Sequence, residues 1–160
     1  MRFHIILNRE GGSLRSRDAD RFAQEVRETL EGLGHEAEVA AVAGDGMDDA
    51  LRQAADGPAD AVMVGGGDGT VSAAAARLAG TDKALAVLPA GTMNLFARSL
   101  GIPLDLEAAV AALGQGRVMA VDVACAGDRI FVHQFSVGLH TKLVRLREKH
   151  SFGSRPGKMW

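Results

Sequence analysis

Residues 61–70 read AVMVGGGDGT: a short apolar run is followed by three glycines, an aspartate, a fourth glycine and a threonine. The apolar run predicts a buried strand, and we expect a helix from about Gly69 to Leu78 to follow it. Glycines permit positive φ and let backbone N–H groups approach an anion without a Cβ in the way. The free N–H groups and the positive dipole end of the helix strengthen this attraction. The stretch therefore predicts a phosphate-binding loop.

Asp68 places a carboxylate inside this loop, where it would repel phosphate unless a metal, a proton or a hydroxyl substrate partners it. This conflict indicates catalysis rather than binding alone. The plainer alternative is a tight packing corner, because glycine-rich turns between a strand and a helix also occur without a ligand. Two common phosphate loops are excluded by spacing, since no lysine completes GxxxxGK[ST] and no third glycine completes GxGxxG.

A second glycine turn follows the next predicted strand. Residues 84–88, ALAVL, are short and apolar, as expected of a buried parallel strand, and PAGTMN at 89–94 then opens a helix through Arg98. In open α/β sheets, ligands bind at the carboxyl ends of the strands, so both turns should face one crevice. Thr92 and Asn94 can either cap this helix or hydrogen-bond a nucleotide.

Together, GGGDGT at 65–70, PAGTMNLFAR at 89–98 and a first strand that ends in Asn8 before Gly11 and Gly12 resemble the diacylglycerol kinase catalytic domain family. That family includes bacterial diacylglycerol and lipid kinases, sphingosine kinases and ceramide kinases, and it is distantly related to NAD kinase. The resemblance extends from the first residue to the last, and the pairing of the two central motifs makes it specific. It implies an NAD kinase-like nucleotide-binding domain that uses ATP and Mg²⁺.

The resemblance also implies roles for individual residues. Asp68 matches the signature aspartate implicated in catalysis or in organising magnesium and water, and no side chain is assigned as a direct metal ligand. The residues that match nucleotide-contacting positions are Asn8, Gly65, Gly66, Gly67, Gly69, Thr70, Gly91, Thr92 and Asn94. Two departures affect fine specificity: Leu95 stands where many members carry Asp, and VAG at 42–44 stands where many have a hydroxyl residue.

The composition agrees with one globular α/β unit of 160 residues, 47% hydrophobic and 24% charged. The 20 glycines and only 4% aromatic residues fit tight turns and small helices that pack close to a sheet. Cys125 is the single cysteine, which excludes an internal disulfide and indicates a reducing compartment. No run approaches the roughly 20 apolar residues of a membrane span, so we expect a cytoplasmic protein without a nucleic-acid partner.

A lipid kinase of this kind would bind peripherally to the inner membrane face to reach its substrate. Residues 142–158 contain six Lys or Arg and one Glu, a net charge of +5 in a chain of net charge −2. Such a stretch is attracted to anionic lipid, although a solvated or cut chain end is the plainer alternative. The oligomeric state stays open.

Predicted strands and helices alternate along the first part of the chain, and this alternation predicts a doubly wound, mostly parallel sheet with helices on both faces. Phe22, Val26, Leu30 and Leu33 share one face of a helix that Gly34 stops. We expect strands at 3–7, 36–42, 59–64 and 84–88, and helices at about 18–33, 48–55, 69–78, 94–98 and 106–113.

The alternation of strands and helices ends after Gly116. Residues 118–124 and 129–137 are expected to form two strands joined by the turn Ala126-Gly127-Asp128, with no helix between them. We therefore divide the chain into an ATP-binding α/β domain at 1–116 and, at 117–160, the first strands of a β-rich second domain. In the family this second domain continues much further and carries the remaining acidic catalytic residues and most of the lipid pocket. The chain is thus expected to be a fragment or a shortened protein.

The function expected is transfer of the ATP γ-phosphoryl group to a lipid hydroxyl by the full-length protein, with diacylglycerol the first choice of acceptor. Such transfer needs mainly alignment and charge neutralisation, plus a group that accepts the hydroxyl proton. The fragment itself is expected to bind nucleotide and to lack full activity. The alternatives are a nucleotide-binding module without turnover and an NAD kinase, whose signature loop is similar.

Overall fold

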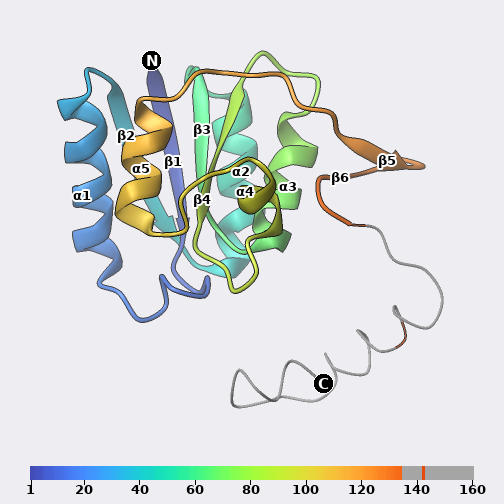
Figure 1. Cartoon of the computed structure of the whole chain (residues 1–160), viewed down its shortest axis with the longest axis horizontal. Helices are drawn as coiled ribbons and strands as arrows, with labels where there is room; N and C mark the ends of the chain where they lie inside the picture. Colours follow the sequence, from blue (N-terminus) through green and yellow to red (C-terminus); the bar gives the residue numbers. More distant parts are fainter. Residues whose placement is uncertain (135–141, 143–160) are drawn as a thin grey trace.

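Four parallel strands form the central sheet in the computed structural model, which describes residues 1–134 and Lys142 (Figure 1). The strand order is β2-β1-β3-β4, and neighbouring strands pair in register, with Ile5 opposite both Val39 and Met63. The strands are β1 (Arg2–Asn8), β2 (Glu36–Val42), β3 (Ala61–Gly66) and β4 (Ala84–Pro89). The predicted parallel sheet is confirmed.

The order of the strands creates a switch point between β1 and β3. The chain steps outward from β1 to β2 and then crosses back over β1 to reach β3 and β4. Because all four strands are parallel, their carboxyl ends lie at one edge, and the connections on either side of this point leave in opposite directions. The loops after β1 and β3 therefore border a crevice at that edge.

Helices cover both faces of the sheet (Figure 1). One face packs against α1 and α5 through an apolar core that includes Phe22, Met63 and Val110, and the other packs against α2 and α3 through Leu51, Val64 and Ala74. The helices are α1 (Ala19–Gly32), α2 (Met47–Asp56), α3 (Asp68–Leu78), α4 (Leu95–Ser99) and α5 (Leu106–Gly114), with a 3-10 turn η1 (Gly44–Gly46). The doubly wound architecture is confirmed.

Local chemistry explains where α1 begins and ends. Asp18 caps its first turn by accepting hydrogen bonds from Asp20 N and Arg21 N. Gly34 takes a φ of +83° just past the helix, a conformation that costs little only for glycine. Leu33 was expected on the buried face, but it lies after the last helical residue and 36% of it is exposed. That part of the prediction is wrong.

All six residues of β3 are buried, because the strand is covered by helices on both faces. The expected end at Val64 is wrong: β3 continues to Gly66, and Gly65 and Gly66 pair with Leu88 and Pro89 of β4. A Cβ on Gly65 would lie 2.8 Å from Leu7 Cδ2, so a larger residue here would require the buried Leu7 side chain to shift. The signature glycines therefore begin inside the sheet.

The segment after Gly116 differs from the prediction in its boundaries. A hairpin is present, formed by β5 (Ala124–Ala126) and β6 (Arg129–Phe131), with Gly127 at φ +60° in the turn. Residues 118–123 form no strand, because no described strand pairs with them, and Val118, Met119, Val121 and Val123 are exposed. Of the second predicted strand, residues 135–137 lie outside the described residues, as does the basic stretch 142–158 apart from exposed Lys142.

Val132 follows β6 and packs against the apolar cluster of Val71, Val87 and Phe96, which anchors the hairpin beside α3 and α4. In the described part of the chain, none of the helices is both long and apolar enough to cross a bilayer.

Candidate functional site

Three loops meet at the carboxyl edge of the sheet: residues 9–18 after β1, the signature loop 66–70 after β3, and residues 90–94 after β4. Ser13 N and Ser13 Oγ donate to Ala90 O at 2.9 and 3.2 Å, and Ala90 N donates to Gly66 O at 3.2 Å. The first residue of the third loop is thus bonded to both Ser13 and Gly66. The two predicted glycine turns lie against each other, as the strand order requires.

Close backbone contact explains several of the loop glycines. A Cβ on Gly12 would lie 2.4 Å from Ala90 O, and one on Gly91 would lie 2.5 Å from Gly67 Cα. The expectation that the signature glycines serve positive φ is wrong, because the described glycines with positive φ are Gly34, Gly80, Gly101 and Gly127. Gly12 and Gly91 are needed because the loops approach one another too closely for a side chain.

Two signature glycines are free of this constraint. Gly67 has a φ of −84°, which any residue adopts, and a Cβ there would meet only Gly91 Cα at an ordinary 3.6 Å. A Cβ on Gly69 would have no protein heavy atom within 4 Å. Neither the backbone conformation nor the packing of the described residues requires glycine at these two positions. The space beside them is open.

The amino terminus of α3 lies at this open space. Gly67 is the N-cap residue and offers no side-chain cap, whereas α1 and α5 are capped by Asp18 and Asp105. The first-turn N–H groups of an α-helix have no partner within the helix, and they carry the positive end of its dipole. The 11-residue helix α3 therefore presents backbone donors without a side-chain cap, as an anion-binding site needs.

Asp68, the predicted catalytic residue, is half-buried and bridges two of the loops. Its Oδ1 accepts a hydrogen bond from Leu95 N at 2.7 Å, which supplies the first N–H of α4 with a cap from another part of the chain. The carboxylate expected to conflict with phosphate thus has a protein partner for one oxygen. Sequence reasoning missed this contact, because 27 residues separate the two groups along the chain.

Asn94 closes the third loop on itself. Its φ of 51° and ψ of 46° are left-handed, and its amide side chain accepts from Gly91 N at 2.8 Å and donates to Pro89 O and Gly91 O at 3.1 and 3.0 Å. Asn94 is the N-cap residue of α4, as one of the two alternatives predicted, but its side chain makes no capping hydrogen bond and folds the turn instead. The other alternative, a nucleotide contact, stays a prediction. Thr92 is exposed at the tip of the loop.

Asn8 and Thr70 come together as the two motifs predict. Asn8 Nδ2 lies 3.5 Å from Thr70 Oγ1, while Asn8 Oδ1 accepts from Glu10 N at 3.0 Å. Glu10 in turn reaches across to the end of β2, where its Oε2 accepts from Gly44 N at 3.3 Å. Sequence reasoning missed Glu10 and Ser13, and it quoted Gly12 and Ala90 within the motifs without assigning them to the site. Glu10 lies two residues after Asn8, and this was the available signal.

The carboxylates at this edge do not form a metal cage. Within the described residues, no group of three or more His, Cys, Asp or Glu side chains could hold a metal ion. Mg²⁺ is commonly bound by one or two carboxylates together with substrate phosphates and waters, so a single aspartate is sufficient. Asp68 fits that limited role through the oxygen that Leu95 N does not engage.

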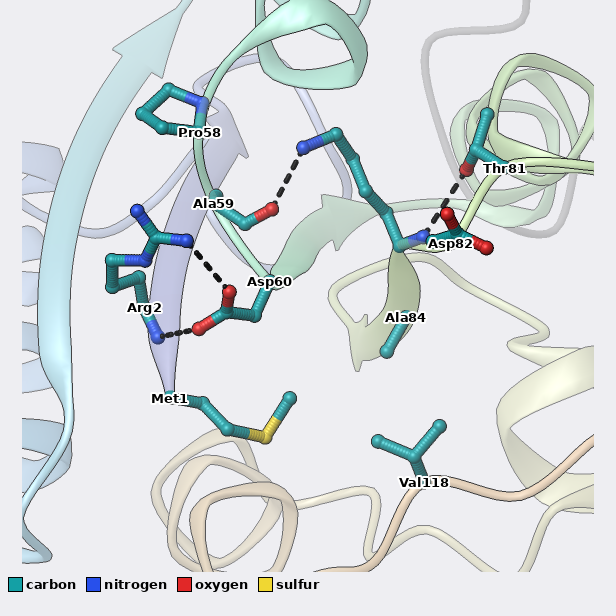
Figure 2. Close-up of a pocket in the computed structure, with 10 residues that line it drawn as sticks. Met1, Arg2, Pro58, Ala59, Asp60, Thr81, Asp82, Ala84 and Val118 are labelled. Carbon is teal, nitrogen blue, oxygen red and sulfur yellow. Dashed lines mark hydrogen bonds and ion pairs between the residues drawn. The ribbon is translucent and has the colours of Figure 1, made fainter.

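A pocket of about 450 Å³ lies at the opposite edge of the sheet, at the amino ends of β1, β3 and β4 (Figure 2). Three of its charged groups pair within its own walls: Arg2 bonds both oxygens of Asp60, and Lys83 Nζ donates to Gly57 O and Ala59 O. The hydrogen bond from the Arg2 side chain is the main cause that lowers the pKa of Asp60 to about 2. We place the candidate site at the loops instead, because backbone donors without a side-chain cap face solvent there.

Comparison with known proteins identifies the family of this chain. The diacylglycerol kinase catalytic domain family matches residues 2–126, which include all three loops. Among relatives, the chain is 37% identical over 99 residues to a probable lipid kinase YegS-like of Cronobacter sakazakii, covering 59% of this chain and 33% of the relative. A protein of the same name from Klebsiella pneumoniae is 39% identical over 88 residues, covering 53% and 30%. The chain thus spans about a third of the length of these curated relatives.

Solved structures show the same fold. A crystal structure of a diacylglycerol kinase from Bacillus anthracis superposes with a TM-score of 0.70 at 27% identity, covering 81% of this chain and 45% of that one. The fold shared with that structure and the family match over residues 2–126 identify the same family. The chain belongs to the diacylglycerol kinase catalytic domain family.

Proposed function

We propose that this chain is the nucleotide-binding part of an ATP-dependent lipid kinase that transfers the γ-phosphoryl group to a lipid hydroxyl. The observation that carries the proposal is the amino terminus of α3, where N–H groups without a side-chain cap lie beside Gly67 and Gly69. Neither the backbone conformation nor packing among the described residues requires glycine at these two positions. A ligand that needs the space explains them.

Polyphosphate is the chemistry that fits this space. Backbone N–H groups and the helix dipole attract anions, and glycines let oxygen atoms approach the backbone closely. The crevice between β1 and β3 is also where nucleotides bind in doubly wound sheets. We therefore assign the ATP phosphates to Gly66, Gly67, Gly69 and Thr70, with Asn8 beside Thr70.

We propose that Asn94 and Gly91 position the third loop. Asn94 is 9% exposed, and its side-chain amide makes hydrogen bonds within the turn. We therefore propose that it sets the shape of the third loop rather than touching the ligand. Gly91 lets that loop lie against Gly67. Thr92, exposed at the tip, is the residue of this loop that is free to contact the nucleotide.

Asp68 is the residue proposed to act on the reacting groups. One oxygen is held by Leu95 N, which orients the carboxylate, and the other is proposed to accept the hydroxyl proton of the acceptor or to bind a water of the metal. Mg²⁺, when bound with ATP, supplies charge neutralisation on the transferring phosphoryl group. The chain contributes alignment through its loops and a fixed base.

We further propose that residues 1–160 by themselves bind Mg·ATP and transfer no phosphate to lipid. The support is the length of the relatives, of which this chain matches about a third. Residues 117–160 are proposed to begin a β-rich second domain, and the hairpin β5–β6 is the described part of it. Peripheral contact with a membrane through residues 142–158 and a cytoplasmic location remain parts of the same proposal.

Two measurements test the function. Calorimetry should show that residues 1–160 bind Mg·ATP, and a protein extended to the length of its relatives should label a lipid acceptor from radioactive ATP. With a lipid acceptor in mixed micelles the rate should depend on its surface density, whereas NAD as acceptor shows no such dependence. Phosphorylation of NAD with no lipid labelled would replace the proposed acceptor, and the absence of nucleotide binding would refute the site itself.

A further inference from the structure

We propose that Glu10 recognises the ribose of the bound nucleotide, with its carboxylate accepting a hydrogen bond from a ribose hydroxyl. The inference rests on the nucleotide-binding function proposed above and adds a specificity-determining residue to it. Glu10 lies in the loop after β1 and is exposed to solvent. Its position is set by one contact with Asn8 at the end of β1 and one with Gly44 after β2.

On one side, Glu10 is joined to the signature loop through a single residue. Its backbone N–H donates to Asn8 Oδ1 at 3.0 Å, and Asn8 Nδ2 lies 3.5 Å from Thr70 Oγ1. Thr70 belongs to the loop assigned to the phosphates. The backbone of Glu10 is therefore adjacent to the phosphate site, and its side chain leads away from it.

On the other side, the carboxylate is held at the carboxyl end of β2. Glu10 Oε2 accepts from Gly44 N at 3.3 Å, and a Cβ on Gly44 would lie only 2.6 Å from this oxygen. The hydrogen bond from Gly44 N is therefore the contact that places this carboxylate at the end of β2. The second oxygen, Oε1, is left for a ligand.

This location matches the distance that a nucleotide has to span. The signature loop follows β3, and β2 lies two strands away across β1, about 10 Å at the usual strand spacing. A nucleoside triphosphate with its phosphates at α3 can extend over β1 toward β2. Its ribose then comes close to the end of β2.

A carboxylate is the side chain suited to that position. In dinucleotide-binding sheets an acid near the end of the second strand accepts hydrogen bonds from the ribose. Here residues 42–44, VAG, carry no polar side chain, and Glu10 supplies a carboxylate to the same place from the neighbouring loop. Asp45, exposed in η1 and adjacent in sequence to Gly44, serves as the control.

The experiment compares ATP, 2′,3′-dideoxy-ATP and inorganic tripolyphosphate, each with Mg²⁺, by calorimetry on residues 1–160. The unaltered chain should bind ATP about tenfold more tightly than the dideoxy nucleotide, as expected for one hydrogen bond to a charged group. Glu10→Ala should reduce that ratio to near one, and Glu10→Gln should keep part of it. Asp45→Asn should leave the ratio unchanged, and tripolyphosphate should bind equally to every variant.

The outcomes separate this inference from the function on which it rests. If the unaltered chain binds neither nucleotide, the proposed function fails and the role of Glu10 falls with it. If both nucleotides bind but the preference for ATP is missing, or survives in Glu10→Ala, the site stands and the role of Glu10 is wrong. If Glu10→Gln also loses tripolyphosphate, Glu10 serves the shape of the loop, and ribose recognition is likewise refuted.

Discussion

Replacement of single glycines by alanine should separate the glycines that shape the loops from those that leave room for a ligand. Gly91→Ala places a Cβ 2.5 Å from Gly67 Cα, about 1 Å inside ordinary contact, and the atom it meets is backbone. Overpacking of this kind costs typically ~1–3 kcal/mol, so the free energy of unfolding should fall by that amount. Gly91→Ala is the variant expected to damage the fold.

Gly69→Ala should have the opposite effect on stability. A Cβ there meets no protein heavy atom within 4 Å, and Gly69 lies in the first turn of α3. Alanine in a helix is favoured over glycine by roughly 0.5–1 kcal/mol, so the free energy of unfolding should rise. Gly67→Ala, with its nearest contact at 3.6 Å, should change it by less than ~0.5 kcal/mol.

Nucleotide affinity should move independently of stability in this series. Gly67→Ala and Gly69→Ala should each weaken Mg·ATP binding at least about tenfold, equivalent to ~1.4 kcal/mol, because a methyl group occupies space assigned to phosphate oxygens. Urea titration followed by circular dichroism gives the free energy of unfolding, and calorimetry gives the dissociation constant. Gly80→Ala is the control for affinity, because Gly80 lies two residues past α3 with φ +79°: alanine there should lower the free energy of unfolding and leave the dissociation constant unchanged.

The reasoning is refuted if Gly69→Ala is stabilised and still binds Mg·ATP with unchanged affinity. That result would mean that the open space beside α3 is not used by phosphate. A stable Gly91→Ala variant would contradict a different step, namely that the two glycine turns are packed too closely for a side chain.

Two further predictions concern carboxylates. In a protein extended to the length of its relatives, Asp68→Asn keeps an acceptor for Leu95 N while losing the base, so turnover should fall by about two to four orders of magnitude with little change in nucleotide affinity; turnover near that of the unaltered enzyme would leave Asp68 only its capping role at α4. Because Arg2 lowers the pKa of Asp60 from 3.8 to about 2, the Arg2–Asp60 pair should stabilise the fold fully above about pH 4 and lose that contribution as the pH falls toward 2. Asp60→Asn should flatten this part of the pH dependence of the free energy of unfolding, and an unchanged profile would show that the exposed pair contributes nothing.

The fold was predictable because its signals are local. The buried run before Gly65, the Asp18 cap and the apolar face of α1 each lie within one element, so period and composition are sufficient to place them. The two glycine turns followed predicted parallel strands, and parallel strands bring their carboxyl ends to one edge. For the same reason the sequence predicts a candidate site at that edge.

The boundaries that failed depended on pairing between elements. β3 extends through Gly65 and Gly66 because β4 offers partners for them, although glycine is a poor strand residue. Residues 118–123 have the composition of a strand but lack a described partner, and they remain exposed. A β-strand is stabilised by its neighbours, so a sequence pattern by itself cannot show whether a neighbour is present.

By itself, the sequence determined a doubly wound parallel sheet, and it predicted a phosphate loop that includes Asp68 and the four signature glycines. Only the tertiary structure decided what these residues do: Asp68 bonds Leu95 N, Gly91 packs on Gly67, and Glu10 reaches Gly44. The physical reason is one of range. The periodicity of a strand or helix depends on residues that are close in sequence. A hydrogen bond or a close backbone contact between loops forms only after the strand order has brought those distant loops together.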